Sequence, residues 1–296
     1  MPVIASFDPW RGRLCTCPPK YSISPYTGCA HACRYCYITS YIPDGFRSRP
    51  KERFLERLKM DLSNVSPQIP ISIANSSDPY TPPEERMQLT RRALQILLES
   101  GFKVQLITKS DLVMRDVDLI AAGNCSVSFT ITTLDEKVSD RLEPGAPPPS
   151  RRLEALRLLT KQGVPCSVRL DPIIPYVNDR DLQGTINAFV EAGASHLTAS
   201  TYKARADNFR RVTATLPDLA ENLTNLYWVR GEVIGRTRYL PVEVRRDIIG
   251  RVMAIVGRYG LSFGTCREGL VQPSLGARCD GTHLIPLRRG LTRRGS

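Results

Sequence analysis

The chain has 296 residues, of which 42% are hydrophobic and 24% are charged, and its formal net charge is +12. No stretch reaches the roughly 18 consecutive apolar residues of a transmembrane helix, and the N-terminus lacks the basic and apolar regions of a signal peptide. Nine cysteines are an odd number for a disulfide framework, so we expect a cytoplasmic protein with no membrane partner. The positive charge favours DNA or RNA as a partner, with an ordinary basic surface as the alternative.

The two ends of the chain differ in composition from its middle. Residues 1–20 are rich in proline and turn formers, which predicts an extended N-terminal arm. Arginines crowd the last residues, where a flexible tail would add phosphate contacts: Arg288, Arg289, Arg293 and Arg294.

Between these ends, apolar runs of strand length alternate with amphipathic segments of helix length. Strands are expected at 21–25, 69–75, 103–108, 125–131, 165–171 and 195–200. Helices are expected at 50–62, 84–100, 111–122, 151–162 and 179–192. The alternation predicts an α/β fold, an open partial (β/α)6 barrel over residues 21–202, with a doubly wound open sheet as the alternative. Residues 203–296 are expected to form a C-terminal extension of helices (203–215 and 241–257) and loops that packs on the barrel.

Residues 26–37 read Y-T-G-C-A-H-A-C-R-Y-C-Y and place Cys29, Cys33 and Cys36 on one tight loop. Three thiolates at this spacing converge on one metal centre more easily than they pack in a core. An iron–sulfur cube takes four ligands, so three cysteines would leave one iron open for chemistry on a bound molecule. The alternatives are a zinc site completed by His31 or a distant residue, or chance spacing.

Polar residues follow each predicted strand. Ser77 lies after the second strand, Lys109 after the third and Thr132 after the fourth, while Arg169 and Asp171 end the fifth. Ligands of parallel α/β folds bind at the carboxyl ends of the strands, so the set predicts a lined pocket. The alternative is that these side chains cap the following helices.

The cysteine loop is followed at regular intervals by S-S-D-P-Y-T-P-P-E, T-K-S-D-L-V-M-R-D, T-L-D-E-K-V-S-D-R-L-E-P-G-A-P and R-L-D-P-I-I-P. Together these blocks resemble the spore photoproduct lyase-like branch of the radical S-adenosylmethionine (radical SAM) superfamily, over residues 8 to about 200. The resemblance implies a [4Fe–4S] cluster on the three cysteines and S-adenosylmethionine on the open iron. It also implies reductive cleavage to a 5′-deoxyadenosyl radical, with ferredoxin or flavodoxin as the kind of electron donor, and the partial barrel fold.

By this resemblance, four residues would bind the cofactor. Tyr35 would lie against its adenine, Ser77 and Lys109 would hold its methionine or ribose groups, and Thr132 would sit beside them. Lysine suits this role as a flexible point charge that reaches a carboxylate.

One position departs from the family pattern. Spore photoproduct lyases carry a hydrogen-donating cysteine two residues before the serine, where this chain has Asn75, and an amide cannot donate a hydrogen atom as a thiol does. Thymine-photoproduct repair by that route is therefore not expected. We expect Tyr80 or another cysteine as the substitute donor, and Arg169 and Asp171 as the other catalytic residues.

Four further cysteines lie outside the β/α core, in polar, turn-rich segments. They form a candidate second metal site, structural zinc or an auxiliary iron–sulfur cluster, with His283 in reserve, and scattered free thiols are the alternative: Cys15, Cys17, Cys266 and Cys279. Cys125 and Cys166 begin strands and are expected to be small core residues.

The function favoured by these patterns is a radical SAM enzyme that repairs or modifies a nucleic acid, on a base that is flipped out or single-stranded. A protein or small-molecule substrate is the nearest alternative. A non-catalytic zinc- or cluster-bearing nucleic-acid-binding protein is the alternative of a different class.

Overall fold

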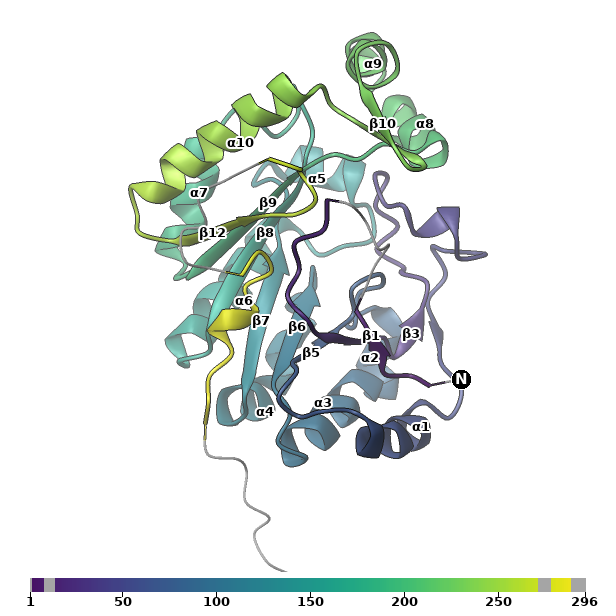
Figure 1. Cartoon of the computed structure of the whole chain (residues 1–296), viewed down its shortest axis with the longest axis vertical. Coiled ribbons are helices and arrows are strands. Elements are labelled where there is room, and N and C mark those ends of the chain that lie inside the picture. Colours follow the sequence, from purple (N-terminus) through teal and green to yellow (C-terminus); the bar gives the residue numbers. More distant parts are fainter. Residues whose placement is uncertain (1, 8–13, 271–277, 289–296) are drawn as a thin grey trace, which may run out of the picture.

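The computed structural model describes residues 2–7, 14–270 and 278–288 (Figure 1). Within them, the main sheet has eight strands in the order β1-β2-β5-β6-β7-β8-β9-β12. Neighbours from β2 to β12 pair in parallel, and β1 pairs antiparallel with β2. The strands are β1 (Ala5–Ser6), β2 (Tyr21–Ile23), β5 (Ile71–Ile73), β6 (Val104–Thr108), β7 (Cys125–Thr130), β8 (Cys166–Ile173), β9 (His196–Thr201) and β12 (Ser262–Thr265). The predicted α/β partial barrel is confirmed, and the six predicted strands are β2 and β5 to β9.

Most of the helices named here cover the outer face of this sheet, whereas the helix at Ala206–Thr215 lies apart from it (Figure 1). Those with predicted counterparts are α1 (Phe54–Asp61), α2 (Pro82–Met87), α3 (Leu89–Glu99), α4 (Val117–Ala122), α6 (Pro149–Lys161), α7 (Leu182–Glu191), α8 (Ala206–Thr215) and α10 (Val242–Gly257). The predicted helix at 84–100 is two helices, because Gln88 adopts a left-handed backbone conformation with φ of 52° between α2 and α3. Short elements that the pattern missed are α5 (Glu136–Leu142), α9 (Ala220–Thr224) and the strands β3 (Tyr26–Thr27), β4 (Arg49–Pro50), β10 (Glu232–Ile234) and β11 (Thr237–Tyr239). The sheet strands β1 and β12 were also not predicted.

The two faces of the sheet have opposite chemistry. The outward side chains are apolar and fully buried under the helices, for example Leu106, Val127 and Leu197. The side chains between them are polar and, apart from half-buried Arg169, also buried. We call this the inner face and define it by Ser72, Gln105, Ser128, Ser167, Arg169 and Thr198. Buried polar groups need hydrogen-bond partners, so the inner face must meet polar chain or ligand.

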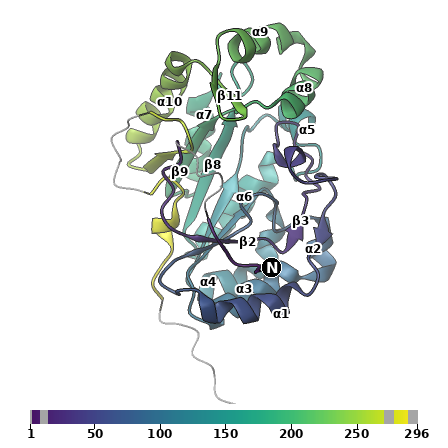
Figure 2. The same cartoon turned by 45° about the vertical axis from the view of Figure 1, so that its right-hand side comes forward.

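The C-terminal segment supplies some of the hydrogen-bond partners of the inner face. Gln105 Nε2 donates to the carbonyl of Asp280 at 2.6 Å, and Thr198 Oγ1 donates to the carbonyl of Cys279 at 2.9 Å. Figures 1 and 2 show this yellow segment and the purple N-terminal arm meeting at the sheet. Lys20 of the arm pairs with Asp280 at 2.6 Å, and both side chains are buried. The two chain ends therefore meet over the inner face.

The predicted division of the chain at residue 202 stays a proposal. The predicted extension supplies β12, which lies beside β9 in the same sheet. At the far end, Arg288 donates its backbone N–H to Asn124 and its guanidinium to the carbonyl of Gly163, so it is held by protein groups. The other three arginines predicted for the tail lie outside the described residues, as do residues 8–13 of the arm. Among the described residues, no helix is long and apolar enough to cross a membrane.

Candidate active site

The cysteine loop follows β3 and is held by backbone hydrogen bonds to neighbouring segments. Cys29 N–H donates to the carbonyl of Gly45 at 2.9 Å, and Arg34 N–H donates to the carbonyl of Leu142 at 2.7 Å. Helix α8 supports the same loop from the predicted extension. There, Asn208 Nδ2 donates to the carbonyl of Tyr35 at 2.9 Å, and Arg211 donates to that of Cys36 at 2.6 Å. The loop is thus fixed by its surroundings on both sides.

Each thiol of the loop is shielded from water. Cys33 is buried, and Cys29 and Cys36 are half-buried. Burial raises the pKa of the Cys29 thiol to about 12 and also raises the pKa of the Cys33 and Cys36 thiols. A bound metal has the opposite effect on the thiol pKa, because coordination to a metal deprotonates a thiol.

Hydrogen-bond donors already face two of these sulfurs. The Cys29 thiol accepts from the backbone N–H groups of Asp78 and His31, and Ile38 N–H donates to Cys36 Sγ at 3.5 Å. Such donors tune the sulfur ligands of iron–sulfur clusters. Three shielded thiols on one loop, with N–H donors aimed at them, fit a cluster of this type.

The imidazole of His31, the alternative fourth metal ligand, lies beside the carboxylate of Asp78. Its Nδ1 lies 3.5 Å from Asp78 Oδ2 and has no hydrogen bond within the described residues. In those residues, no three His, Cys, Asp or Glu side chains close around a single ion. A cube does not require this, since each cysteine binds a different iron.

The strand ends meet the cysteine loop at Glu143, which the sequence analysis did not identify. Thr132 Oγ1 donates to Glu143 Oε1 at 2.7 Å, and the Tyr35 hydroxyl donates to the same oxygen. Lys109 Nζ lies 3.7 Å from Glu143 Oε1 and 5.6 Å from the centre of the Tyr35 ring. Three of the four residues predicted for the cofactor thus come together around one carboxylate.

Glu143 is ionised in this setting. Burial opposes its charge, but Lys109 and Arg152, together with the hydrogen bonds from Tyr35 and Thr132, outweigh that effect and lower its pKa to about 2. Arg152 forms a fully buried ion pair with the second carboxylate oxygen. A buried carboxylate with two cations fixes the position of the groups around it, at the cost of desolvation.

Ser77 lies beside this group rather than in it. Its hydroxyl donates to the carbonyl of Tyr26 at 3.2 Å, and the residue is 7% exposed. The next residue, Asp78, accepts from Thr108 Oγ1 and from Lys109 N–H, both at 2.7 Å. Asp78 thus ties the Ser77 segment to the strand end that carries Lys109.

The three predicted catalytic residues are not brought together. Arg169 and Asp171 pair at 2.6 Å at the end of β8. The Tyr37 hydroxyl of the cysteine loop is close enough to Asp171 to interact with it electrostatically. Tyr80 is 2% exposed and donates to buried Asp116 at 3.1 Å, in a separate network. Tyr80 also contributes to the wall of the cavity described below, and its catalytic role stays a prediction.

The four remaining predicted metal ligands do approach one another. Cys17 Sγ lies 3.8 Å from Cys279 Sγ, the Cys15 thiol interacts with that of Cys17, and Cys266 lies within electrostatic range of both Cys17 and Cys279. Cys125 and Cys166 are fully buried core residues, as predicted.

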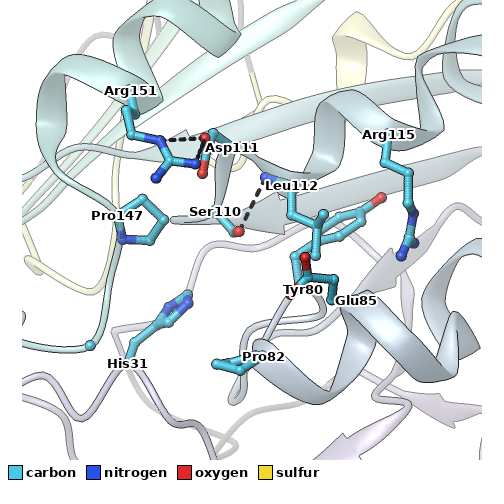
Figure 3. A pocket seen from close by; sticks show the side chains of 11 residues that line it. His31, Tyr80, Pro82, Glu85, Ser110, Asp111, Leu112, Arg115, Pro147 and Arg151 are labelled. Carbon is cyan, nitrogen blue, oxygen red and sulfur yellow. Dashed lines mark hydrogen bonds and ion pairs between the residues drawn. The ribbon is translucent and has the colours of Figure 1, made fainter.

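A cavity of about 420 Å³ opens next to the cysteine loop (Figure 3). His31 and Gly145 contribute to one wall, and Ser110 to Leu112, after β6, contribute to another. Arg151 on its rim pairs with Asp111. None of the four predicted cofactor residues lines it, so this cavity is distinct from the group around Glu143.

The model of the Radical SAM superfamily matches residues 23–189, more than half of the chain. The chain belongs to the radical SAM superfamily. It is 25% identical over 271 residues to the uncharacterized protein Rv2578c of Mycobacterium tuberculosis, covering 83% of this chain and 76% of that protein. It is 21% identical over 256 residues to the radical SAM Nalpha-GlyT isomerase of Pseudomonas phage M6, covering 82% of this chain and 53% of the isomerase.

Among solved structures, this radical SAM chain is similar to spore photoproduct lyase complexed with dinucleoside spore photoproduct. The TM-score is 0.65 at 16% identity, over 83% of this chain and 75% of the lyase. This similarity shows a shared fold and agrees with the branch indicated by the sequence motifs. Superfamily membership implies a [4Fe–4S] cluster and S-adenosylmethionine as cofactors.

Proposed function

We propose that this radical SAM protein is an enzyme that modifies a base of DNA or RNA. Cys29, Cys33 and Cys36 would hold its [4Fe–4S] cluster, and S-adenosylmethionine would bind beside the group around Glu143. When bound, these cofactors would supply a radical that abstracts hydrogen, after one-electron cleavage of S-adenosylmethionine.

The observation that carries the proposal is the meeting of three segments at Glu143. Tyr35 comes from the cysteine loop, Lys109 from the end of β6 and Thr132 from the segment after β7. The ammonium group of Lys109 is only loosely paired at 3.7 Å and remains able to reach a ligand carboxylate. The Tyr35 ring is oriented through its hydroxyl and offers an aromatic face. A charged and an aromatic group next to the thiols suit an amino-acid nucleoside.

A nucleic acid substrate is favoured by charge and by the chemistry of the barrel. The net charge of +12 attracts phosphates. Arg169 and Asp171, at the end of β8, offer a hydrogen-bond donor and acceptors to a base edge. The structurally similar lyase was solved with a dinucleoside photoproduct, so this fold accommodates such a ligand in that protein. A duplex base would have to leave its stack to reach the inner face.

The reaction would differ from thiol-dependent photoproduct repair. Asn75 occupies the position of the hydrogen-donating cysteine, and its Nδ2 donates to Ser22 Oγ at 2.8 Å. An amide in this position binds and orients but does not return a hydrogen atom to a carbon radical. The proposed outcome is therefore base modification or rearrangement that does not use residue 75 as donor.

The proposed electron donor is a ferredoxin or flavodoxin. The nine cysteines are free thiols, which favours a reducing compartment such as the cytoplasm, where these carriers act.

The test is an anaerobic assay of the iron-reconstituted full-length protein with a chemical reductant and S-adenosylmethionine. We expect 5′-deoxyadenosine to form, to increase with single-stranded DNA or RNA, and to be absent with Cys36→Ala. Mass spectrometry of nucleosides from the added nucleic acid then identifies the modified base. A cluster-loaded protein that forms no 5′-deoxyadenosine would contradict the enzyme, as would a colourless zinc-bound loop. Formation without any nucleic acid product would contradict only the substrate class.

A further inference from the structure

A group of four cysteines joins the two ends of the chain, apart from the cysteine loop. We call Cys15, Cys17, Cys266 and Cys279 the clasp. Cys17 and Cys279 are 262 positions apart in the sequence, yet their sulfurs lie 3.8 Å apart. We propose that the clasp binds one zinc ion through four thiolates and thereby fastens the N-terminal arm and the C-terminal segment to the barrel.

The fold brings two clasp cysteines to the last strand pair of the sheet. Cys266 directly follows β12, and its N–H donates to the carbonyl of Ala199 in β9 at 3.0 Å. The carbonyl of Cys279 accepts from Thr198 of β9 at 2.9 Å. Gly264 of β12 lies against Cys279 so closely that an added Cβ would be 2.5 Å from its Cα. The absence of a side chain at this position allows the two cysteine-bearing segments to come together.

The arm delivers the other two cysteines to the same place. The ion pair of Lys20 with Asp280 fixes the arm next to Cys279. Cys15 and Cys17 are separated by one residue, and the N–H of Cys17 donates to the Cys15 thiol. Figure 2 shows the purple arm reaching the yellow C-terminal segment across the sheet.

The spacing of Cys17 and Cys279 distinguishes between three uses of paired thiols. A disulfide requires a sulfur–sulfur distance of about 2.05 Å. A tetrahedral ion with zinc–sulfur bonds of about 2.3 Å places its sulfurs about 3.8 Å apart, which is the distance observed here. In an iron–sulfur cube each cysteine binds its own iron, so two ligand sulfurs lie farther apart than on a shared ion. The distance therefore rules out a disulfide and a cube and fits two thiolates on one metal atom; a hydrogen bond between two thiols has the same length, and the metal analysis below distinguishes the two.

Donors around the clasp suit thiolates. The Thr16 hydroxyl interacts with the Cys279 sulfur, and the Arg169 guanidinium interacts with that of Cys266. Lys20 is near Cys15 and Cys17, and Lys203 is near Cys266. Positive charge and hydrogen bonds from surrounding residues stabilise the excess negative charge of a four-thiolate site.

Two clasp thiols must move for the site to close. Within the described residues, no three metal-binding side chains already surround one point. A change of χ1 between staggered rotamers moves a cysteine sulfur by about 3 Å without moving the backbone, and the proposal requires a movement of this kind at Cys15 and Cys266. A site filled by four protein ligands leaves no open position, so its role is structural.

The experiment uses full-length protein in which Cys29, Cys33 and Cys36 are all changed to Ala, which removes the cluster loop as a metal ligand. Zinc is measured by elemental analysis, and cobalt(II) replaces zinc as a spectroscopic probe of tetrahedral thiolate coordination. We expect one zinc per chain and a thiolate-to-cobalt charge-transfer band. Adding Cys17→Ser and Cys279→Ser should abolish both, whereas adding Cys125→Ala and Cys166→Ala should preserve both.

Each outcome decides the proposal without reference to catalysis. Iron and sulfide retained by the triple variant, a disulfide between Cys17 and Cys279 after anaerobic purification, or no bound zinc would each overturn it. If the triple variant does not fold, wild-type protein supplies the measurement. Zinc should then accompany the iron at one per chain, and release of that zinc by a thiol reagent should make the segment at residues 278–288 accessible to protease.

Discussion

The two clusters of cysteines in this radical SAM protein, the cysteine loop and the clasp, are assembled in different ways. The loop cysteines lie within eight residues and share short-range backbone bonds, such as Cys36 N–H to the carbonyl of Cys33 at 3.0 Å, although distant segments also brace the loop. The clasp joins residues 262 positions apart and exists only because the complete sheet brings both ends of the chain together. A local group can form as soon as its loop is ordered, whereas a distant group depends on the whole fold. The loop is therefore suited to hold a reactive cofactor and the clasp to hold the structure.

The largest expected effect is a loss of iron, but not of zinc, when a cysteine of the loop is replaced. Replacing Cys36 with Ala leaves two loop thiolates, too few to hold a cube. We expect the iron content of the reconstituted protein to fall to background while its zinc content stays unchanged. Elemental analysis measures both metals in one sample, and Cys166→Ala is the control. Iron that persists in Cys36→Ala would place the cluster elsewhere.

The next effect concerns the carboxylate that links the loop to the strand ends. Glu143→Gln keeps the shape of the side chain but leaves Arg152 and Lys109 without their buried counter-charge. Breaking a buried pair in this way costs about 3–5 kcal/mol of unfolding free energy. Urea unfolding measures it. The matched control is Glu154→Gln, which removes an exposed pair with Arg157 and should cost less than about 1 kcal/mol.

The stability lost in Glu143→Gln should depend on pH. The folded-state pKa of Glu143 is about 2, below its ordinary value of 4.5. Its contribution to stability is therefore complete above about pH 4.5 and is lost as the pH falls toward 2. The stability difference between wild type and Glu143→Gln should shrink over this window. A difference that stays constant down to pH 2 would show that Glu143 is not the ionised partner.

Removing the charge of Lys109 tests whether this residue binds S-adenosylmethionine. Lys109→Ala should weaken S-adenosylmethionine binding by about 1.5–3 kcal/mol, the usual worth of a charge-assisted hydrogen bond. Calorimetry under anaerobic conditions measures it, with exposed Lys161→Ala as the control. Unchanged affinity in Lys109→Ala would exclude a direct contact.

The smallest expected effects come from replacing a glycine beside each cysteine cluster, Gly28 at the cysteine loop and Gly264 at the clasp. Gly28 has φ of 77°, and an added Cβ would be 2.2 Å from the carbonyl oxygen of Arg47. Gly28→Ala should therefore lower the iron content, and Gly264→Ala, which presses on Cys279, should lower the zinc content, each at about 1–3 kcal/mol of strain. Gly101→Ala has a similar φ of 79° with nothing within 4 Å and is the control for backbone strain alone. Equal losses of both metals in both variants would mean general unfolding and would remove the distinction.

The sequence predicted well whatever depends on local spacing. The cysteine loop, six parallel strands and the strand-end positions of Lys109 and Thr132 all follow from periods and motifs within short windows. Glu143 was missed because it follows the short helix α5, which was not predicted, and an acidic residue before a proline in a turn is ordinary. Its burial is created by Tyr35, Lys109 and Arg152, which come from three other segments.

The sequence also failed to predict the direction of a side chain and the pairing of two strands that are far apart in the chain. The motif around Tyr80 does not indicate where its side chain points, and its direction is set by Asp116, which is 36 positions away. The strand β12 is four residues long, and its partner β9 is more than 60 positions earlier. Neither feature leaves a periodic signal in the sequence.

We propose that the cysteine loop and the strand ends form one cofactor site. The most direct measurement is the electron paramagnetic resonance spectrum of the reduced, iron-reconstituted protein, recorded with and without S-adenosylmethionine. An open iron next to Lys109 predicts that the cofactor changes the spectrum of the wild-type protein, and that Lys109→Ala needs a higher cofactor concentration for the same change. A wild-type spectrum that does not respond to saturating S-adenosylmethionine would contradict the claim.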